Sequence, residues 1–219
     1  LPVLALGRLL LLVRELVPPA ELLHQHVVEL GIAERQVRAL GARAVFREQA
    51  HAVAFDAEVR AEIAADAAAF RAAHGRAPGL GVILVGDDPA SRSYVTSKQK
   101  ACAAAGIQSR EIALPATASQ AEILAAVRQL NEDEATDGVL VQLPLPDSTM
   151  EADVLAAVDP AKDVDGVHAL NIGRLVQGKP ALAPCTPCGV LELLRRVGIP
   201  LAGANVVVIG RSQIVGRPL

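Results

Sequence analysis

The first candidate for chemistry is a lysine that follows a predicted strand. Tyr94 and Lys98 are four residues apart, so a helix over 91–105 places both on one face. The start of this helix lies near the carboxyl edge of the sheet, where open α/β sheets bind ligands. Lys98 can then reach a ligand, and partial burial favours the neutral amine used in proton transfer. The alternative is a solvated helix on which Lys98 and Lys100 face water.

A glutamine lies near the end of a second apolar run. Residues 138–143 read GVLVQL, which is apolar enough for a strand buried on both faces. A buried amide needs hydrogen-bond partners, and Gln142 can donate and accept at once. It therefore suits the positioning of a ligand or of a lysine ammonium. The alternative is a Gln142 side chain satisfied by loop backbone alone.

Two carboxylates, Asp163 and Asp165, stand one residue apart before Gly166. The spacing predicts a tight loop that presents one carboxylate to a ring nitrogen of a ligand and caps backbone with the other. A metal-binding loop is a competing interpretation, but the further acidic ligands of a calcium loop are missing from this stretch. An Asx-turn is a third interpretation. We assign no ligand or base role to His168.

A glycine-containing turn after residue 209 is typical of phosphate binding. Residues 205–209 are an apolar run of strand type, and Gly210 and Gly216 follow it. Glycines allow close backbone approach, and a helix start offers amides to an anion. The spacing is not the standard G-x-G-x-x-G, because Ser212 replaces the middle glycine. Arg211 can pair with a ribose phosphate, which favours NADP over NAD.

The three cysteines do not make a disulfide framework, which favours a reducing compartment. Cys185 and Cys188 form a C-x-x-C pair, which is typical of a redox or zinc site. No second pair follows it, so a metal site would be incomplete. The other interpretation is two reduced thiols near the start of a helix.

These residues need a framework of alternating strands and helices. The apolar spacing predicts helices at 56–74, 91–105, 119–131, 151–158 and 185–197, and strands at 80–85, 109–114, 138–143 and 205–209. Gly106 is a predicted helix stop, Ser119 and Glu122 a capping box, and Thr186 an N-cap. The alternation predicts an α/β fold with a parallel sheet.

The composition of the 219 residues limits the partners. Apolar residues make up 52% of the chain and aromatic residues 2%, which predicts a core of Ala, Val, Leu and Ile. A net charge of −3 gives no strong basic field for nucleic acid or an anionic membrane. No apolar stretch approaches the ~20 residues that span a bilayer. We expect a cytoplasmic protein that binds small molecules.

Six stretches, in this order, resemble the methylenetetrahydrofolate dehydrogenase/cyclohydrolase family. They are GDDPASRSYVTSK (86–98), DGVLVQLPLP (137–146), PAKDVDG (160–166), NIGRL (171–175), PCTP (184–187) and IGRSQIVGRP (209–218). The resemblance covers residues 56–219. Six ordered motifs are far more specific than any one of them.

The resemblance implies two reactions in a cleft between a catalytic domain and a Rossmann-type NADP domain. Hydride passes from 5,10-methylenetetrahydrofolate to NADP+, and water opens the methenyl product to 10-formyltetrahydrofolate. The implied catalytic residues are Lys98 for proton transfer, Gln142 as its hydrogen-bonding partner and Asp165 for the pterin ring. The implied substrate site is Tyr94, Lys98, Val141, Gln142, Leu143 and Asp165. The implied NADP contacts are Gly210, Arg211, Ser212 and Gly216.

The expected domains are a helical segment of unknown role at 1–52, a catalytic domain at 53–183 and the start of an NADP domain at 184–219. The family suggests a homodimer. We expect an incomplete dinucleotide domain, because a complete one needs ~100 further residues. The family's opening Asp-Gly-Lys turn is also replaced, by His-Ala-Val at 51–53.

Three interpretations stay open. The chain is a fragment of the bifunctional enzyme, or a folate-binding remnant that turns nothing over, or another NADP-dependent dehydrogenase of small metabolites. The combination of Tyr94, Lys98, Gln142 and Asp165 argues against the third.

Overall fold

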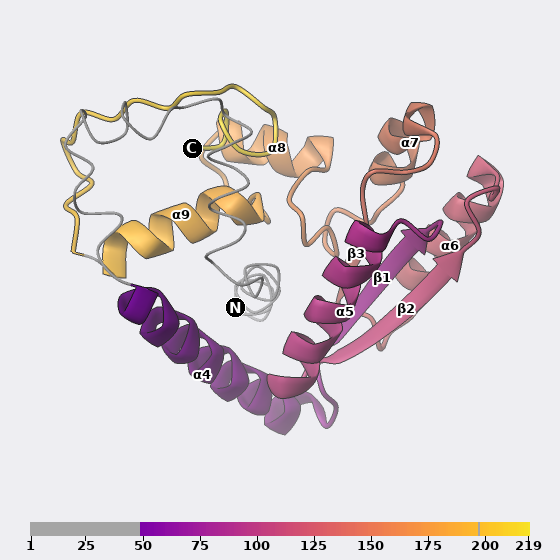
Figure 1. Cartoon of the computed structure of the whole chain (residues 1–219), viewed down its shortest axis with the longest axis horizontal. Helices are drawn as coiled ribbons and strands as arrows, with labels where there is room; N and C mark the ends of the chain where they lie inside the picture. The colour runs from indigo at the N-terminus through magenta and orange to yellow at the C-terminus, as the bar shows by residue number, and fades with distance from the viewer. Residues whose placement is uncertain (1–48, 197) are drawn as a thin grey trace.

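The computed structural model describes residues 49–196 and 198–219 (Figure 1), so the segment expected at 1–52 lies almost wholly outside them. The elements in chain order are α4 (Gln49–His74), β1 (Gly79–Val85), α5 (Pro89–Ala104), β2 (Gln108–Leu114), α6 (Gln120–Glu132), β3 (Gly138–Val141), η2 (Ser148–Met150), α7 (Glu151–Ala156), α8 (Ala169–Val176) and α9 (Cys185–Arg196). None of these helices is long and apolar enough to cross a membrane.

The three strands form one parallel sheet in the order β2-β1-β3, which confirms the predicted fold class. Strand β1 is central: Gly79 pairs with Gln108 of β2, and Leu80 pairs with Gly138 of β3. All seven residues of β1 are buried. Because the strands are parallel, their carboxyl ends meet at one edge of the sheet.

Helices cover both faces of the sheet, as an all-parallel sheet requires (Figure 1). Helices α4 and α5 pack on one face, with Ile63 and Val95 in a cluster that includes Val82. Helices α6 and α7 pack on the other, with Val127 and Val154 against the remaining inward side chains of β1 and β3. The core is aliphatic, as the composition predicts.

The helix starts follow their capping residues. Asp88 caps α5, and its carboxylate accepts a hydrogen bond from the Ser91 amide at 2.8 Å. The predicted capping box of α6 is present, with Ser119 and Glu122 bonded in both directions. The Ser119 amide that donates to Glu122 lowers the pKa of that carboxyl group. Gly106 ends α5 with φ of +75°, a conformation that glycine adopts without strain.

Helices α8 and α9 differ from the prediction. Helix α9 begins at Cys185, so Thr186 lies inside its first turn and is not the N-cap. The Cys188 amide donates to the Pro184 carbonyl at 3.3 Å, so the first turn starts from Pro184, two residues before the expected N-cap. Helix α8 was not predicted, because its eight residues are too short for a clear helical period.

The predicted strand at 205–209 is wrong. Residues 198–219 contain no helix and no strand. The four apolar side chains of 206–209 are 42% to 86% exposed. A strand is completed by hydrogen bonds to a neighbouring strand, and no strand of the described residues pairs with this run. The apolar pattern alone therefore does not make this run a strand.

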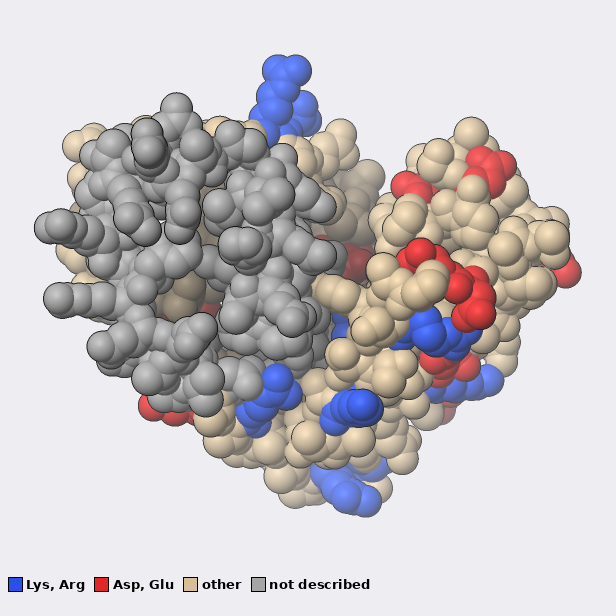
Figure 2. Space-filling model, viewed as in Figure 1, with Lys and Arg blue, Asp and Glu red and all other residues tan. Residues whose placement is uncertain are grey.

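Charges of both signs are interspersed over the described surface that faces the viewer in Figure 2. The view shows no large field of one sign there, in keeping with the small net charge.

Candidate active site

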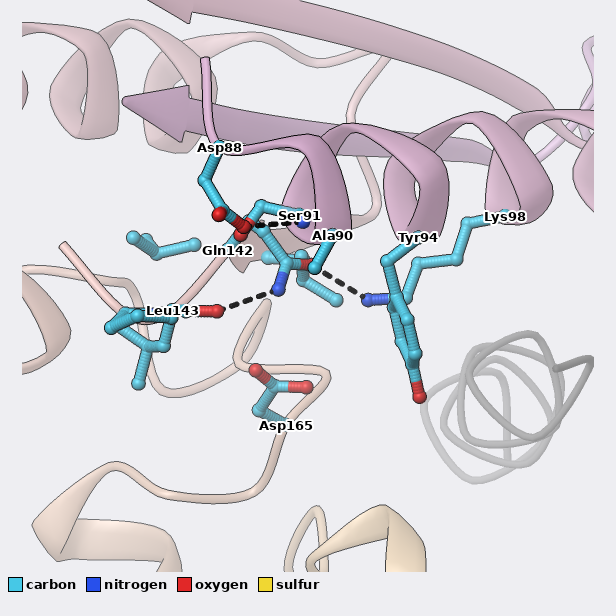
Figure 3. A pocket seen from close by; sticks show the side chains of 11 residues that line it. Asp88, Ala90, Ser91, Tyr94, Lys98, Gln142, Leu143 and Asp165 are labelled. Carbon is cyan, nitrogen blue, oxygen red and sulfur yellow. Dashed lines mark hydrogen bonds between the residues drawn. The ribbon is translucent and has the colours of Figure 1, made fainter. Parts of the chain in front are cut away.

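A cavity of about 300 Å³ opens at the carboxyl edge of the sheet (Figure 3). The start of α5, the end of β3 with the loop after it, and one residue of a later loop form its wall. The lining residues are Asp88, Ala90, Ser91, Tyr94, Lys98, Leu140, Val141, Gln142, Leu143, Pro144 and Asp165. All six residues expected to bind substrate are in this set.

Lys98 is buried in the wall of this cavity, with 3% of its surface exposed. Its Nζ donates to Oε1 of Gln142 at 3.2 Å. Nζ also lies 4.7 Å from the centre of the Tyr94 ring, whose face attracts a cation. The solvated alternative for Lys98 is therefore wrong, whereas Lys100 on the same helix is exposed.

The Gln142 side chain is held in one orientation. Its Nε2 donates to the Leu143 carbonyl at 2.7 Å, so Oε1 must face Lys98. Its backbone amide donates to the carbonyl of Ile83 on β1 at 2.9 Å. Gln142 follows β3 directly instead of lying within it, because the strand ends at Val141. The side chain thus makes both contacts considered from the sequence, one to the lysine ammonium and one to the loop backbone.

The two loop aspartates lie in different surroundings, Asp163 against the backbone and Asp165 at the cavity. Asp163 is 3% exposed, and its Oδ2 accepts the His168 amide at 2.9 Å. Asp165 lines the cavity, and Figure 3 shows its carboxyl group across from Tyr94 and Gln142. Within the described residues, no group of three or more His, Cys, Asp and Glu side chains is placed to hold a metal ion.

Sequence reasoning missed the residues that support this loop. His168 caps α8, because its Nδ1 accepts the Leu170 amide at 3.1 Å. Asn171 is 1% exposed and bonds to Asp163. A signal for His168 was available, since a side-chain acceptor directly before an amphipathic stretch is a helix-start pattern. Asp88, Ala90 and Ser91 were also not expected in the cavity wall.

The first cysteine of the C-x-x-C pair has a structural role. Cys185 is buried, and its Sγ donates to the Val164 carbonyl, next to Asp165, at 2.9 Å. Cys188 is half-buried, and neither residue is in a disulfide. Cys102 is buried on α5, and burial raises the pKa of its thiol from 9.0 to about 12.

The expected NADP contacts lie together, away from the cavity wall. Gly216 packs against the Gly210 carbonyl so closely that no side chain fits there. Ser212 Oγ accepts the Val215 and Gly216 amides at 3.2 and 3.3 Å. The exposed backbone of Gly210 and the cationic Arg211 suit an anionic dinucleotide, whereas the Gly210 carbonyl covers Gly216. The strand and helix that would frame them are not formed in the described chain.

Comparison with known proteins gives two family matches. Residues 50–165 match the catalytic domain of the tetrahydrofolate dehydrogenase/cyclohydrolase family. Residues 184–219 match the NAD(P)-binding domain of the same family. The bifunctional protein FolD of Geobacillus thermodenitrificans is 53% identical over 161 residues, 74% of this chain and 56% of its own length. FolD 3 of Rhizorhabdus wittichii is 54% identical over 166 residues, 76% of this chain and 55% of its own length.

Solved structures agree with these matches. The FolD enzyme of Campylobacter jejuni superimposes with a TM-score of 0.72 at 44% identity, over 75% of this chain and 58% of that one. The FolD enzyme of Trypanosoma brucei, solved with NADP and an inhibitor, gives 0.68 at 37% identity, over 73% and 55%. This chain thus spans little more than half the length of its relatives. The first family match alone covers more than half of the chain, and the chain belongs to the tetrahydrofolate dehydrogenase/cyclohydrolase family.

Proposed function

We propose that this chain carries the folate site of a bifunctional enzyme of one-carbon metabolism. The enzyme oxidises 5,10-methylenetetrahydrofolate with NADP+ and hydrolyses the methenyl product to 10-formyltetrahydrofolate. The observation that carries the proposal is the buried Lys98, whose Nζ lies 3.2 Å from Gln142 Oε1 in the same cavity wall as Asp165. The family match supports it.

The hydrolysis needs a group that moves protons. Water adds to the bridge carbon of the methenyl cation, and the bond from that carbon to one ring nitrogen breaks as that nitrogen gains a proton. A cation and water give a neutral formyl amide, so one proton is released overall. Lys98 is the amine in the cavity wall, and we assign it these transfers. Gln142 and Tyr94 hold it in place.

Asp165 is assigned to substrate orientation. A carboxylate accepts hydrogen bonds from the N–H groups of a heterocycle such as the pterin ring. Val141 and Leu143 give the cavity wall apolar surface for the same ring. Fixing the ring between these groups holds the bridge carbon near Lys98, which raises the rate by proximity.

The oxidation requires the nucleotide. When bound, NADP+ would supply the acceptor for the hydride that leaves the bridge carbon. Gly210, Arg211, Ser212 and Gly216 would hold its phosphates. We accordingly divide the chain into a catalytic domain at 53–183 and an NADP-binding segment at 184–219, and the matched ranges support this division. We also infer a cytoplasmic homodimer, which the family resemblance supports.

The test is hydrolysis of 5,10-methenyltetrahydrofolate by the purified chain, followed by loss of its absorbance. We expect Lys98→Ala to lower the rate about a hundredfold or more, the usual effect of a lost proton-transfer group. Lys100→Ala is the matched control, since this lysine is exposed on the same helix. Equal hydrolysis by wild type and Lys98→Ala would refute the assignment.

A second candidate function is folate binding without turnover. It is favoured by the contrast between a formed cavity and a 198–219 segment with no helix or strand. Under this alternative the folded chain binds methenyltetrahydrofolate, measured by fluorescence titration, but hydrolyses it no faster than buffer. Turnover that depends on Lys98 would exclude it.

A further inference from the structure

Asp165 is carried by a loop, not by a helix or strand, so its position depends on what holds that loop. The loop runs from the end of α7 to the start of α8 and holds 157–168. A carboxylate that orients a ligand must stay within a fraction of an ångström of its place. The loop is accordingly tied at several points.

The backbone before Asp165 is fixed to the sheet and to α6. The Val139 amide donates to the Lys162 carbonyl at 2.7 Å, and Val139 and Asp163 form a parallel bridge. Lys162 Nζ donates to three carbonyl groups at the end of α6: those of Leu130, Asn131 and Asp133. These bonds fix one side of the loop, up to Asp163.

A buried pair of side chains closes the loop. Asn171, on α8, donates from Nδ2 to Asp163 Oδ2 at 2.9 Å and to the Pro160 carbonyl at 2.8 Å. The same Oδ2 accepts the His168 amide at 2.9 Å. Asp163 and Asn171 are 3% and 1% exposed. The Asn171 side chain, on the first turn of α8, thus ties together Pro160 and Asp163 of the loop.

The backbone after Asp165 is confined in a different way. Gly166 has φ of +63°, and a side chain on it would collide with the backbone of Ala183 and Pro184. The backbone at Gly166 is therefore packed closely on that side, and Cys185 Sγ donates to the Val164 carbonyl at 2.9 Å. The side-chain bonds that reach across the loop are those of the Asp163–Asn171 pair.

We propose that Asp163 and Asn171 are positioning residues, which hold the Asp165 carboxylate in the cavity and so set the affinity for the heterocycle of the substrate. Neither residue lines the cavity. The inference rests on the proposed function, because it concerns the same folate site.

The test is a double-mutant cycle on the full chain, with methenyltetrahydrofolate hydrolysis as the assay. Asn171→Leu keeps the volume and removes the donor. It raises KM about tenfold and leaves kcat within about threefold, because only ring binding is disturbed. In an Asp165→Ala background the same change has no further effect on KM, since Asn171 acts through Asp165.

A merely structural role gives a different result. It would lower the amount of active protein, and hence the apparent kcat, with KM unchanged. Ser119→Ala, which weakens the distant cap of α6, is the control for this behaviour. An unchanged KM in Asn171→Leu, or an equal rise in both backgrounds, overturns the proposal. Asp163→Asn keeps an acceptor oxygen and serves if Asn171→Leu does not fold, with an expected rise in KM of about threefold.

Hydrogen exchange separates this inference from the proposed function. If the wild-type chain hydrolyses nothing, the hydrolysis proposal fails. The positioning proposal still predicts that the Gly166 and His168 amides exchange at least about tenfold faster in Asn171→Leu than in wild type. Exchange at wild-type rates in this loop would overturn it.

Discussion

At the scale of single residues, the site depends on hydrogen bonds that orient a buried amine. Lys98 is held between the Gln142 oxygen and the Tyr94 ring, and Gln142 is held in turn by the Leu143 carbonyl. Each partner fixes the next, so the lysine has one position. The chemistry assigned to Lys98 therefore depends on Gln142.

Replacing Gln142 tests this dependence. Gln142→Ala removes the acceptor that orients Lys98 and is expected to lower kcat for methenyltetrahydrofolate hydrolysis about tenfold to a hundredfold, and to move the pH–rate profile. Steady-state kinetics between pH 6 and 9 measure both. Gln120→Ala is the matched control, since that amide is bonded to Asp153 on the surface. An unchanged kcat and an unchanged pH–rate profile would show that the chemistry of Lys98 does not depend on Gln142.

The thiol of Cys102 gives a prediction with a defined pH range. Burial raises its pKa from 9.0 to about 12, so the folded chain holds it as the unreactive thiol. We expect an alkylating reagent at pH 8 to leave Cys102 unmodified in the folded chain and to modify it in urea, as read by mass spectrometry. Above pH 9 the unfolded chain loses the Cys102 proton while the folded chain keeps it. The contribution of the buried thiol to the free energy of unfolding is therefore complete below pH 9 and is lost as the pH rises towards 12. Modification in the folded chain at pH 8 would contradict this.

At the scale of elements, the start of the sheet depends on one partly buried ion pair. Arg76 binds both carboxylate oxygens of Asp137 at 2.6 and 2.7 Å, and Asp137 also accepts the Gly79 amide at 2.8 Å. The pair joins the turn before β1 to the turn before β3. The hydrogen bonds that the Arg76 guanidinium donates to Asp137 raise the pKa of Arg76.

Asp137→Ala is expected to destabilise the chain by about 2 to 3 kcal/mol, because it leaves the Gly79 amide and the guanidinium without their acceptor. Urea denaturation measures this change. Asp87→Ala is the control, since Asp87 is 86% exposed in its pair with Arg92 and should cost less than about 1 kcal/mol. Equal losses of stability in the two variants would show that the Arg76–Asp137 pair stabilises the chain no more than an exposed ion pair does.

The sequence predicted most of these elements because their signals are local. The apolar periods located the three strands and five of the helices, and Ser119 with Glu122 located a cap. Tyr94 and Lys98 were expected on one face, and their contact follows from helical spacing. Asn171 could not be found in this way, since its partner lies eight residues back across a loop. The strand at 205–209 failed for the same reason, because pairing depends on a non-local neighbour.

At the scale of the whole molecule, α9 is joined to α4 across 134 residues of chain. Arg196 Nη2 donates to Glu62 at 2.6 Å, and its Nε donates to Glu192 at 2.8 Å. Figure 1 shows the two helices meeting at this end. Helix α4 belongs to the first family match, and α9 belongs to the second. The ion pair therefore links the parts that those matches define.

Removing this link should loosen α9 alone. Arg196→Ala is expected to speed amide exchange in α9 about tenfold without changing α6, as measured by hydrogen-exchange mass spectrometry. Arg195→Ala is the matched control, because Arg195 pairs within its own helix, with Glu192 at 3.6 Å. The same exchange in both variants would show that the link between the helices has no effect.

The most direct test of the central claim is a crystal structure of the chain with 5,10-methenyltetrahydrofolate or a stable analogue. The account predicts the pterin ring in the cavity between Tyr94 and Asp165, with its N–H groups bonded to Asp165 and the bridge carbon within about 4 Å of Lys98 Nζ. A ligand bound elsewhere, or in the cavity with its bridge carbon far from Lys98, would contradict the proposed folate site.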